Sequence, residues 1–321
     1  MKLRDLARTA GLALAVTGLL TGTAAVVRTG AADGRALAPE APSGAAAGRT
    51  PAGDAFHPVV REAAEGLPDR TVYRPADGKA VRQPLPVLIW QNGGCRPANM
   101  LFMNTLMLVA ARGFVVVADG APDAPSDTAT GSPQPERVTQ VIDWLKHDRL
   151  ARKQLGNKIN VSAIAVAGQS CGGVEALVAG ADRRVDSVLS LNSGFFPTPF
   201  GGYGRENLAD LHTPVLFVDG GPFDAAHANA VANYDLVTVP AAHVTNPQAG
   251  HALAFYGMRL DDAGRPLPDD GRVTLLEEQV EVIVNWLDYT LNGNRKARAY
   301  FTGSCGLCGV PGWSVQTKNG L

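Results

Sequence analysis

Short apolar runs alternate with longer stretches of helical spacing along most of the chain. Glycine, proline or polar residues bound each run, which is typical of strands; the six runs cover residues 71–75, 86–90, 114–118, 164–167, 185–191 and 214–219. Apolar residues at intervals of three and four predict helices over residues 100–112, 138–150, 174–179 and 275–291. Near-continuous apolar strands indicate burial on both faces. The alternation therefore predicts an α/β fold with a doubly wound, mostly parallel sheet.

The first 55 residues depart from this pattern. Basic residues precede an apolar run over residues 10–27, which predicts a secretory signal peptide over residues 1–30 and an exported, extracytoplasmic protein. A retained membrane anchor is the alternative, but threonine and glycine interrupt the run, so we expect no stable membrane span after cleavage. Residues 31–55 are rich in alanine, proline and glycine and predict a disordered linker. Residues 56–321 are expected to form one domain.

Composition limits the kinds of partner. Of the 321 residues, 45% are hydrophobic, which suffices for a full core in a single domain. The net charge is -1 and no stripe of lysine and arginine occurs, so we expect no nucleic-acid partner. The sequence gives no indication of the oligomeric state.

The strongest candidate for chemistry is Gly168-Gln-Ser170-Cys-Gly172, between a predicted strand and a predicted helix. A Gly-x-Ser-x-Gly sequence in this setting is the signature of a nucleophile elbow, a tight turn that holds the serine hydroxyl clear of the sheet. Glycines two positions before and after the serine avoid collision with the neighbouring strand and helix. The alternative is an ordinary strand-to-helix turn in which Ser170 caps the helix.

In hydrolases with such an elbow, an acid and then a histidine follow the serine along the chain. The acid belongs in the loop after the strand at residues 214–219. We favour Asp224, because a tight turn there would leave its carboxylate facing the site. Asp219 lies closer to the strand and is the alternative, as a structural turn carboxylate.

Six histidines are candidates for the base. Three precede the acid, and His227 follows it too closely. His251 and His243 remain, both beyond a strand expected around residues 236–241. We favour His251, because it follows glycine in a polar loop, whereas His243 has the setting of a strand residue. In this assignment His251 takes the serine proton and the acid orients the ring.

An oxyanion hole needs backbone donors, usually from the residue after the serine and from the loop after the third strand. In this chain they are the N–H groups of Cys171 and Gly94. Because Cys95 adjoins one donor and Cys171 is the other, we expect a Cys95–Cys171 disulfide. The alternative is that both are small buried residues.

The other two cysteines, Cys305 and Cys308, predict a local disulfide in an exported chain. A zinc site would need two further ligands, and no second such pair exists, so no metal site is expected. A thioredoxin-like motif would lie between a strand and a helix, whereas this pair lies in a glycine- and proline-rich tail.

Phe195 and Phe196 follow the strand at residues 185–191, at the sheet edge where open α/β sheets bind ligands. We expect them to line an apolar substrate-binding subsite; packing against the sheet edge is the alternative. Few residues separate this strand from the next, which leaves no room for a cap domain, so we expect an open site.

Several short motifs resemble a group of secreted α/β-hydrolases that is distantly similar to the dienelactone hydrolase and cutinase-like polyester hydrolase families. They include Trp90-x-Asn-Gly-Gly-Cys95, Gly168-Gln-Ser-Cys-Gly-Gly173, Asn192-Ser-Gly194, Gly220-Gly-x-x-Asp224, Gly250-His251 and Cys305-Gly-Leu-Cys308. The resemblance covers the chain from about His57 to its end. It implies an α/β-hydrolase fold and esterase chemistry, with Ser170, Asp224 and His251 in the matching triad positions.

These features favour a secreted serine hydrolase that cleaves carboxylic esters through an acyl-enzyme. Its substrate would be a small-molecule or polymer ester, and no cofactor is expected. Amide or peptide hydrolysis on the same fold is one alternative. A non-catalytic binding protein on a hydrolase scaffold, and a thiol oxidoreductase that uses Cys305 and Cys308, are the others.

Overall fold

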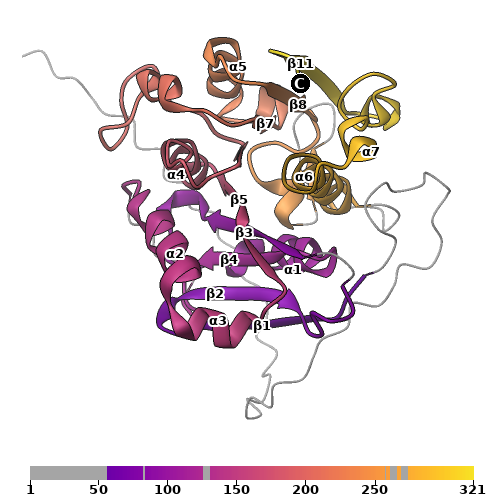
Figure 1. The fold of residues 1–321 in the computed structure, drawn as a ribbon. Coiled ribbons are helices and arrows are strands. Elements are labelled where there is room, and N and C mark those ends of the chain that lie inside the picture. Colours follow the sequence, from indigo (N-terminus) through magenta and orange to yellow (C-terminus); the bar gives the residue numbers. More distant parts are fainter. Residues whose placement is uncertain (1–55, 82–83, 126–130, 257, 261–265, 269–273) are drawn as a thin grey trace, which may run out of the picture. The chain divides into compact units, whose positions relative to one another are not determined.

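The computed structural model describes residues 56–81, 84–125, 131–256, 258–260, 266–268 and 274–321 (Figure 1). The predicted signal peptide, residues 1–30, and the predicted linker, residues 31–55, lie outside these described residues. The described residues all belong to one compact unit. Within them, no helix has the length and apolar character that crossing a membrane requires.

A nine-stranded sheet is the largest element of the described chain (Figure 1). In order across the sheet, the strands are β1 (Val59–Ala64), β2 (Leu67–Pro75), β4 (Val115–Asp119), β3 (Leu85–Gln91), β5 (Ile159–Gln169), β6 (Ser187–Leu191), β7 (Val215–Asp219), β8 (Ala241–Thr245) and β11 (Ser314–Lys318). The strands from β4 to β8 run parallel to one another, whereas β1 and β2 at one edge and β11 at the other are antiparallel. The prediction of a mostly parallel α/β sheet is confirmed, and the six predicted strands correspond to β2 through β7.

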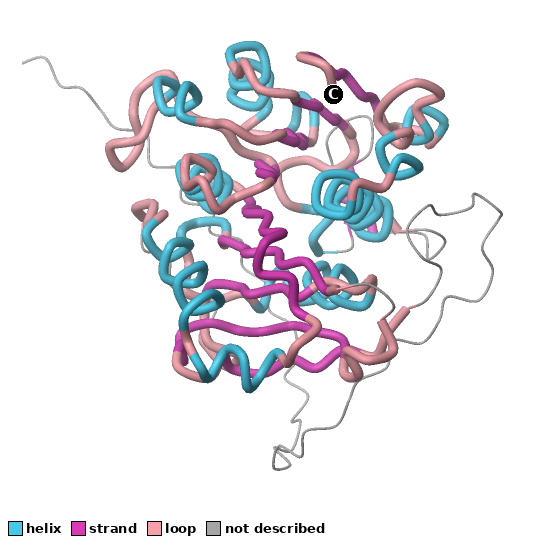
Figure 2. Tube along the Cα trace, in the orientation of Figure 1, coloured by secondary structure: helices cyan, strands magenta, loops and turns pink. Residues whose placement is uncertain are grey.

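Helices pack on both faces of the sheet because the side chains of each strand alternate between two apolar cores. In β3, Leu88 and Trp90 belong to one core. Val87 and Ile89 belong to the other. Helices α1 and α6 contribute to the first core, and α2, α3, α4 and α5 to the second (Figure 2). The helices are α1 (Met103–Ala111), α2 (Glu136–His147), α3 (Arg149–Leu155), α4 (Cys171–Ala179), α5 (His227–Leu236), α6 (Leu275–Asn292) and α7 (Arg295–Arg298).

The prediction of a strand around residues 236–241 is wrong. Helix α5 continues to Leu236, and β8 begins only at Ala241, which pairs with Val215 of β7. Proline has no N–H group to donate to a ladder, so the hydrogen-bonded strand starts after Pro240. His243 therefore lies within β8, as its sequence setting indicated.

The carboxyl ends of the parallel strands meet at one edge of the sheet, where open α/β sheets bind ligands. β5 ends directly before Ser170, and β7 ends at Asp219, shortly before Asp224. β3 ends before the turn Gly93–Cys95. The residues that the sequence singles out for chemistry therefore follow strand ends within one part of the sheet, β3-β5-β6-β7.

Candidate active site

Ser170 lies in the turn between β5 and α4 with its backbone in an uncommon conformation. Its φ is 54° and its ψ is -118°, a region that residues other than glycine rarely adopt. A side chain at Gly168 would overlap the Gly172 carbonyl, and one at Gly172 would overlap the Gln91 carbonyl of β3. The two glycines let the strand and the helix close on each other, and Ser170 stays partly exposed at the sheet edge.

Asp224 lies in the loop after β7, where it is buried and accepts hydrogen bonds on both oxygens. Its Oδ1 accepts from the Ala226 N–H at 2.8 Å, and its Oδ2 from the Gly220 N–H at 2.9 Å. Oδ2 also accepts from the Asn192 side-chain amide at 2.8 Å. The His251 ring is a further partner, because its Nδ1 lies 2.6 Å from Oδ1. These contacts fix the direction of the carboxylate.

His251 extends this set of hydrogen bonds to Ser170. Its Nε2 lies 3.1 Å from the Ser170 Oγ, while its Nδ1 faces the carboxylate just described. The main chain around the ring is held as well. The His251 carbonyl accepts from the Gln169 side chain at 2.9 Å, and the Gly250 carbonyl accepts from the Asn192 amide at 2.9 Å. An imidazole placed between a hydroxyl and a carboxylate can take the hydroxyl proton.

Asp219 and His243, the alternative acid and base, pair with each other instead. His243 Nε2 is hydrogen-bonded to Asp219 Oδ2, and His227 Nδ1 lies 2.8 Å from Asp219 Oδ1. Asp219 is fully buried and His243 nearly so. Burial raises the pKa of the Asp219 carboxyl, but hydrogen bonds from His243 and the Gly221 N–H outweigh it and hold that pKa below its ordinary value. This pair therefore joins the ends of β7 and β8.

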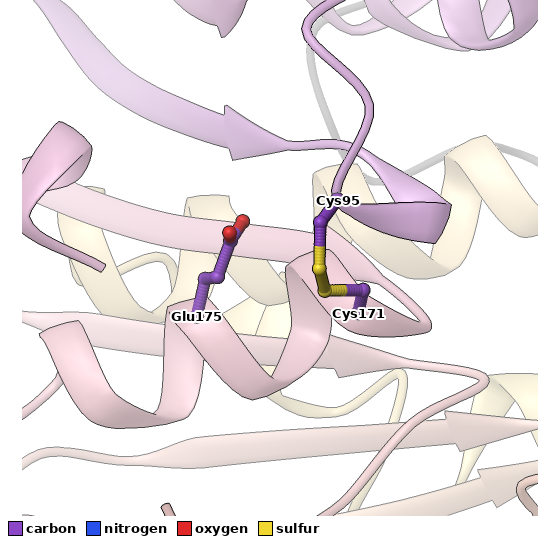
Figure 3. Close-up of side chains that lie close together, drawn as sticks. All are labelled: Cys95, Cys171 and Glu175. Atoms are coloured by element: carbon purple, nitrogen blue, oxygen red, sulfur yellow. A yellow bond between two sulfur atoms is a disulfide. The ribbon is translucent and has the colours of Figure 1, made fainter. Parts of the chain in front are cut away.

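A disulfide joins the two turns that carry the candidate oxyanion donors. Cys95, which follows Gly94 in the turn after β3, is bonded to Cys171, the first residue of α4 (Figure 3). Their Cα atoms lie 5.3 Å apart. The first N–H groups of a helix have no partner within it, so the Cys171 N–H is free to donate at the site. The predicted pairs Cys95–Cys171 and Cys305–Cys308 are both confirmed.

Ser170, His251 and Asp224, which are far apart in the sequence, thus lie in one hydrogen-bonded row. The sequence matches no protein-family model and no curated protein. The resemblance to secreted α/β-hydrolases therefore rests on short motifs alone. The chemistry of the site rests on its geometry.

The two candidate subsite residues lie in different surroundings. Phe195 is fully buried in the core that faces α2 to α5, and its N–H donates to the Asn233 side chain at 2.8 Å. Phe196 is 43% exposed and meets the Phe200 ring edge-on, with centroids 5.7 Å apart. Phe195 therefore packs inside the sheet edge, as the alternative interpretation held, and of the two residues only Phe196 is exposed at the surface.

Sequence reasoning assigned no role to the residue that connects the candidate acid and the candidate base. Asn192, directly after β6, donates from one side-chain amide to both the Asp224 carboxylate and the Gly250 carbonyl. The available signal was an asparagine directly after a buried strand, at the sheet edge where the other candidates lie.

Glu175, one turn after Cys171 in α4, is a buried acidic residue beside the disulfide (Figure 3). Its Oε1 accepts a hydrogen bond from the Gln134 N–H at 2.7 Å. Its carboxylate and the sulfurs of Cys95 and Cys171 lie within 4.8 Å of one another. The sulfurs are bonded to each other, so neither is a thiolate that could bind a metal ion. Burial, the largest effect, raises the pKa of Glu175 to about 7.

We expect the Glu175→Gln variant to be more stable than the wild type above about pH 7, with the difference shrinking toward about pH 5. Folded Glu175 stays protonated up to about 7, whereas the unfolded residue ionises near 4.5. The folded state binds more protons between these values, so the wild-type free energy of unfolding falls as pH rises through that window. Urea midpoints across this range measure the effect, with Glu206→Gln at an exposed position as the control. Parallel curves for wild type and Glu175→Gln would contradict the prediction.

Proposed function

We propose that the protein is a serine hydrolase that cleaves carboxylic esters through an acyl-enzyme intermediate. The observation that carries this proposal is the His251 ring, which lies 3.1 Å from Ser170 Oγ and 2.6 Å from Asp224 Oδ1. These are the contacts that a Ser–His–Asp triad uses. We propose an α/β-hydrolase fold for the scaffold, because a mostly parallel sheet with the serine on a strand-to-helix turn is compatible with it.

The reaction has two halves. His251 takes the Ser170 proton as the serine oxygen attacks the ester carbonyl, and the Asp224 carboxylate stabilises the imidazolium that forms. The Gly94 and Cys171 N–H groups donate to the oxyanion of the tetrahedral intermediate. His251 then protonates the leaving alcohol, and a water molecule activated by the same ring hydrolyses the acyl-enzyme.

The substrate class follows from the surroundings of Ser170. The connection between β6 and β7 forms only a short 3₁₀ helix, Arg205–Asp210, and an isolated bridge between Phe200 and Tyr203. This connection inserts no cap domain, and Phe196 within it is exposed. An open site with an apolar border suits small-molecule or polymer esters, which we propose as substrates. Amide hydrolysis needs the same residues and is separated from ester hydrolysis by assay.

The four cysteines support an exported location. They form two disulfides in the described chain, Cys95–Cys171 and Cys305–Cys308. Such bonds persist in oxidising compartments and are rare in the cytosol. We therefore propose that the protein acts outside the cytoplasm.

Covalent labelling tests the proposed nucleophile. A fluorophosphonate reacts with a serine whose hydroxyl is activated by a base, so the folded wild type is expected to be labelled at Ser170. The Ser170→Ala variant is expected to take up no label, and heat-denatured wild type is the control for activation by the fold. Hydrolysis of p-nitrophenyl acetate and of the matching anilide then separates ester from amide chemistry. Folded wild type without label at Ser170 would contradict the proposal and favour a non-catalytic protein on this scaffold.

A further inference from the structure

Arg96 places a cation against the peptide that carries the candidate Gly94 donor. It follows Cys95 in the turn after β3, and its side chain folds back over Gly94. Its Nη1 lies 2.5 Å from the point that a Cβ on Gly94 would occupy, and it donates a long hydrogen bond of 3.4 Å to the Gly93 carbonyl. The guanidinium can approach this closely only because Gly94 has no side chain. It therefore contacts the carbonyl side of the Gly93–Gly94 peptide, whose N–H, one of the two proposed donors, points to the opposite side.

This guanidinium has no counter-ion in the part of the chain that the structure describes. No carboxylate there lies within 4.0 Å of it, and its buried Nε has no hydrogen-bond partner. Arg70 in β2 also has a buried Nε without a partner but differs in its counter-ions, because its guanidinium pairs with Asp69 and Asp119. An arginine with unused donors interacts strongly with a negative charge that arrives or develops nearby.

We propose that the positive charge of Arg96 stabilises the oxyanion during ester hydrolysis, in addition to the backbone donors of Gly94 and Cys171. The inference rests on the proposed function. Charge on the carbonyl oxygen grows only as the tetrahedral intermediate forms, so a cation on the carbonyl side of the Gly93–Gly94 peptide, where it polarises the Gly94 N–H, favours the transition state over the neutral substrate. The Cys95–Cys171 disulfide ties the preceding residue to α4. The turn that carries Arg96 is therefore held to the helix that begins after Ser170.

The Arg96→Gln variant is expected to lower kcat for neutral p-nitrophenyl acetate by about 10- to 100-fold, with little change in KM. Glutamine keeps a polar side chain but not the charge, and a neutral ester binds before any charge develops. Arg96→Lys restores the charge and is expected to recover part of kcat. Arg152→Gln, at an exposed position in α3, is the matched control and is expected to leave kcat unchanged. Melting temperatures confirm that each variant is folded.

A boronic acid inhibitor distinguishes charge stabilisation from a structural role. It is neutral in solution and becomes a negatively charged tetrahedral adduct on Ser170, so its inhibition constant is expected to rise in Arg96→Gln by the factor by which kcat/KM falls. An unchanged kcat, or a lower kcat with an unchanged inhibition constant, would overturn the proposal. A loss confined to esters that carry a carboxylate would also overturn it and would assign Arg96 to substrate binding. If the wild type takes up no fluorophosphonate label, the proposed function itself is contradicted, and the role proposed for Arg96 is contradicted with it.

Discussion

The His251→Ala variant is expected to lose about 10⁵- to 10⁶-fold in kcat toward a neutral ester while it remains folded. Without the imidazole, the Ser170 proton has no acceptor and the leaving alcohol has no donor. The side chain of His251 is 37% exposed, so its removal leaves no cavity in a core. Steady-state assays with p-nitrophenyl acetate measure the loss of kcat, and the melting temperature checks that the variant is folded.

His243→Ala is the matched control, because His243 also faces a buried carboxylate. Its ring is hydrogen-bonded to Asp219 rather than to Ser170, so kcat is expected to stay within a few-fold of the wild type. Its stability is expected to fall by about 3 kcal/mol, since removal of one partner leaves a buried carboxylate short of a donor. A folded His243→Ala protein without activity, beside an active His251→Ala protein, would reverse the assignment of the base.

Removal of the Cys95–Cys171 disulfide is expected to lower the free energy of unfolding by about 4 kcal/mol. The bond joins residues 76 positions apart, and a link across so long a loop removes much of the entropy of the unfolded chain. In a domain of this size such a loss lowers Tm by about 10 °C. The Cys95→Ala/Cys171→Ala variant, measured by calorimetry, gives the value. Its kcat is expected to fall as well, because the turn that carries Gly94 is no longer tied to α4.

The second disulfide provides the comparison. Cys305 and Cys308 are three positions apart, so their bond closes a short loop and removes less entropy from the unfolded chain. Cys305→Ala/Cys308→Ala is therefore expected to lower Tm less and to leave kcat unchanged. Equal losses of Tm and kcat in the two double variants would contradict the role assigned to Cys95–Cys171.

Elements that are buried along their whole length could be predicted from the sequence. The runs at residues 86–90 and 114–118 are the fully buried strands β3 and β4, whose side chains must be apolar on both faces. Strand β11 could not be predicted, because it lies at the edge of the sheet and its sequence, SVQTK, is mostly exposed. Its pairing with β8 depends on backbone hydrogen bonds, which leave no apolar pattern.

The candidate site divides in a similar way. Ser170 could be singled out because the glycines around it mark a tight turn, and the order along the chain then limits the choice of acid and base. Phe195 and Phe196 are adjacent and chemically alike, so only their burial separates them. The position of Arg96 over Gly94, and the absence of a carboxylate near it among the described residues, are properties of the folded chain that no spacing in the sequence encodes.

The side chain of Asn192 holds two parts of the candidate site at once. Its one amide nitrogen donates to Asp224 at 2.8 Å and to the Gly250 carbonyl, next to His251, at 2.9 Å. A small displacement of the end of β6 is therefore expected to move the Asp224 carboxylate and the main chain next to His251 in the same direction. Their separation is then expected to change less than it would if the two loops were held independently.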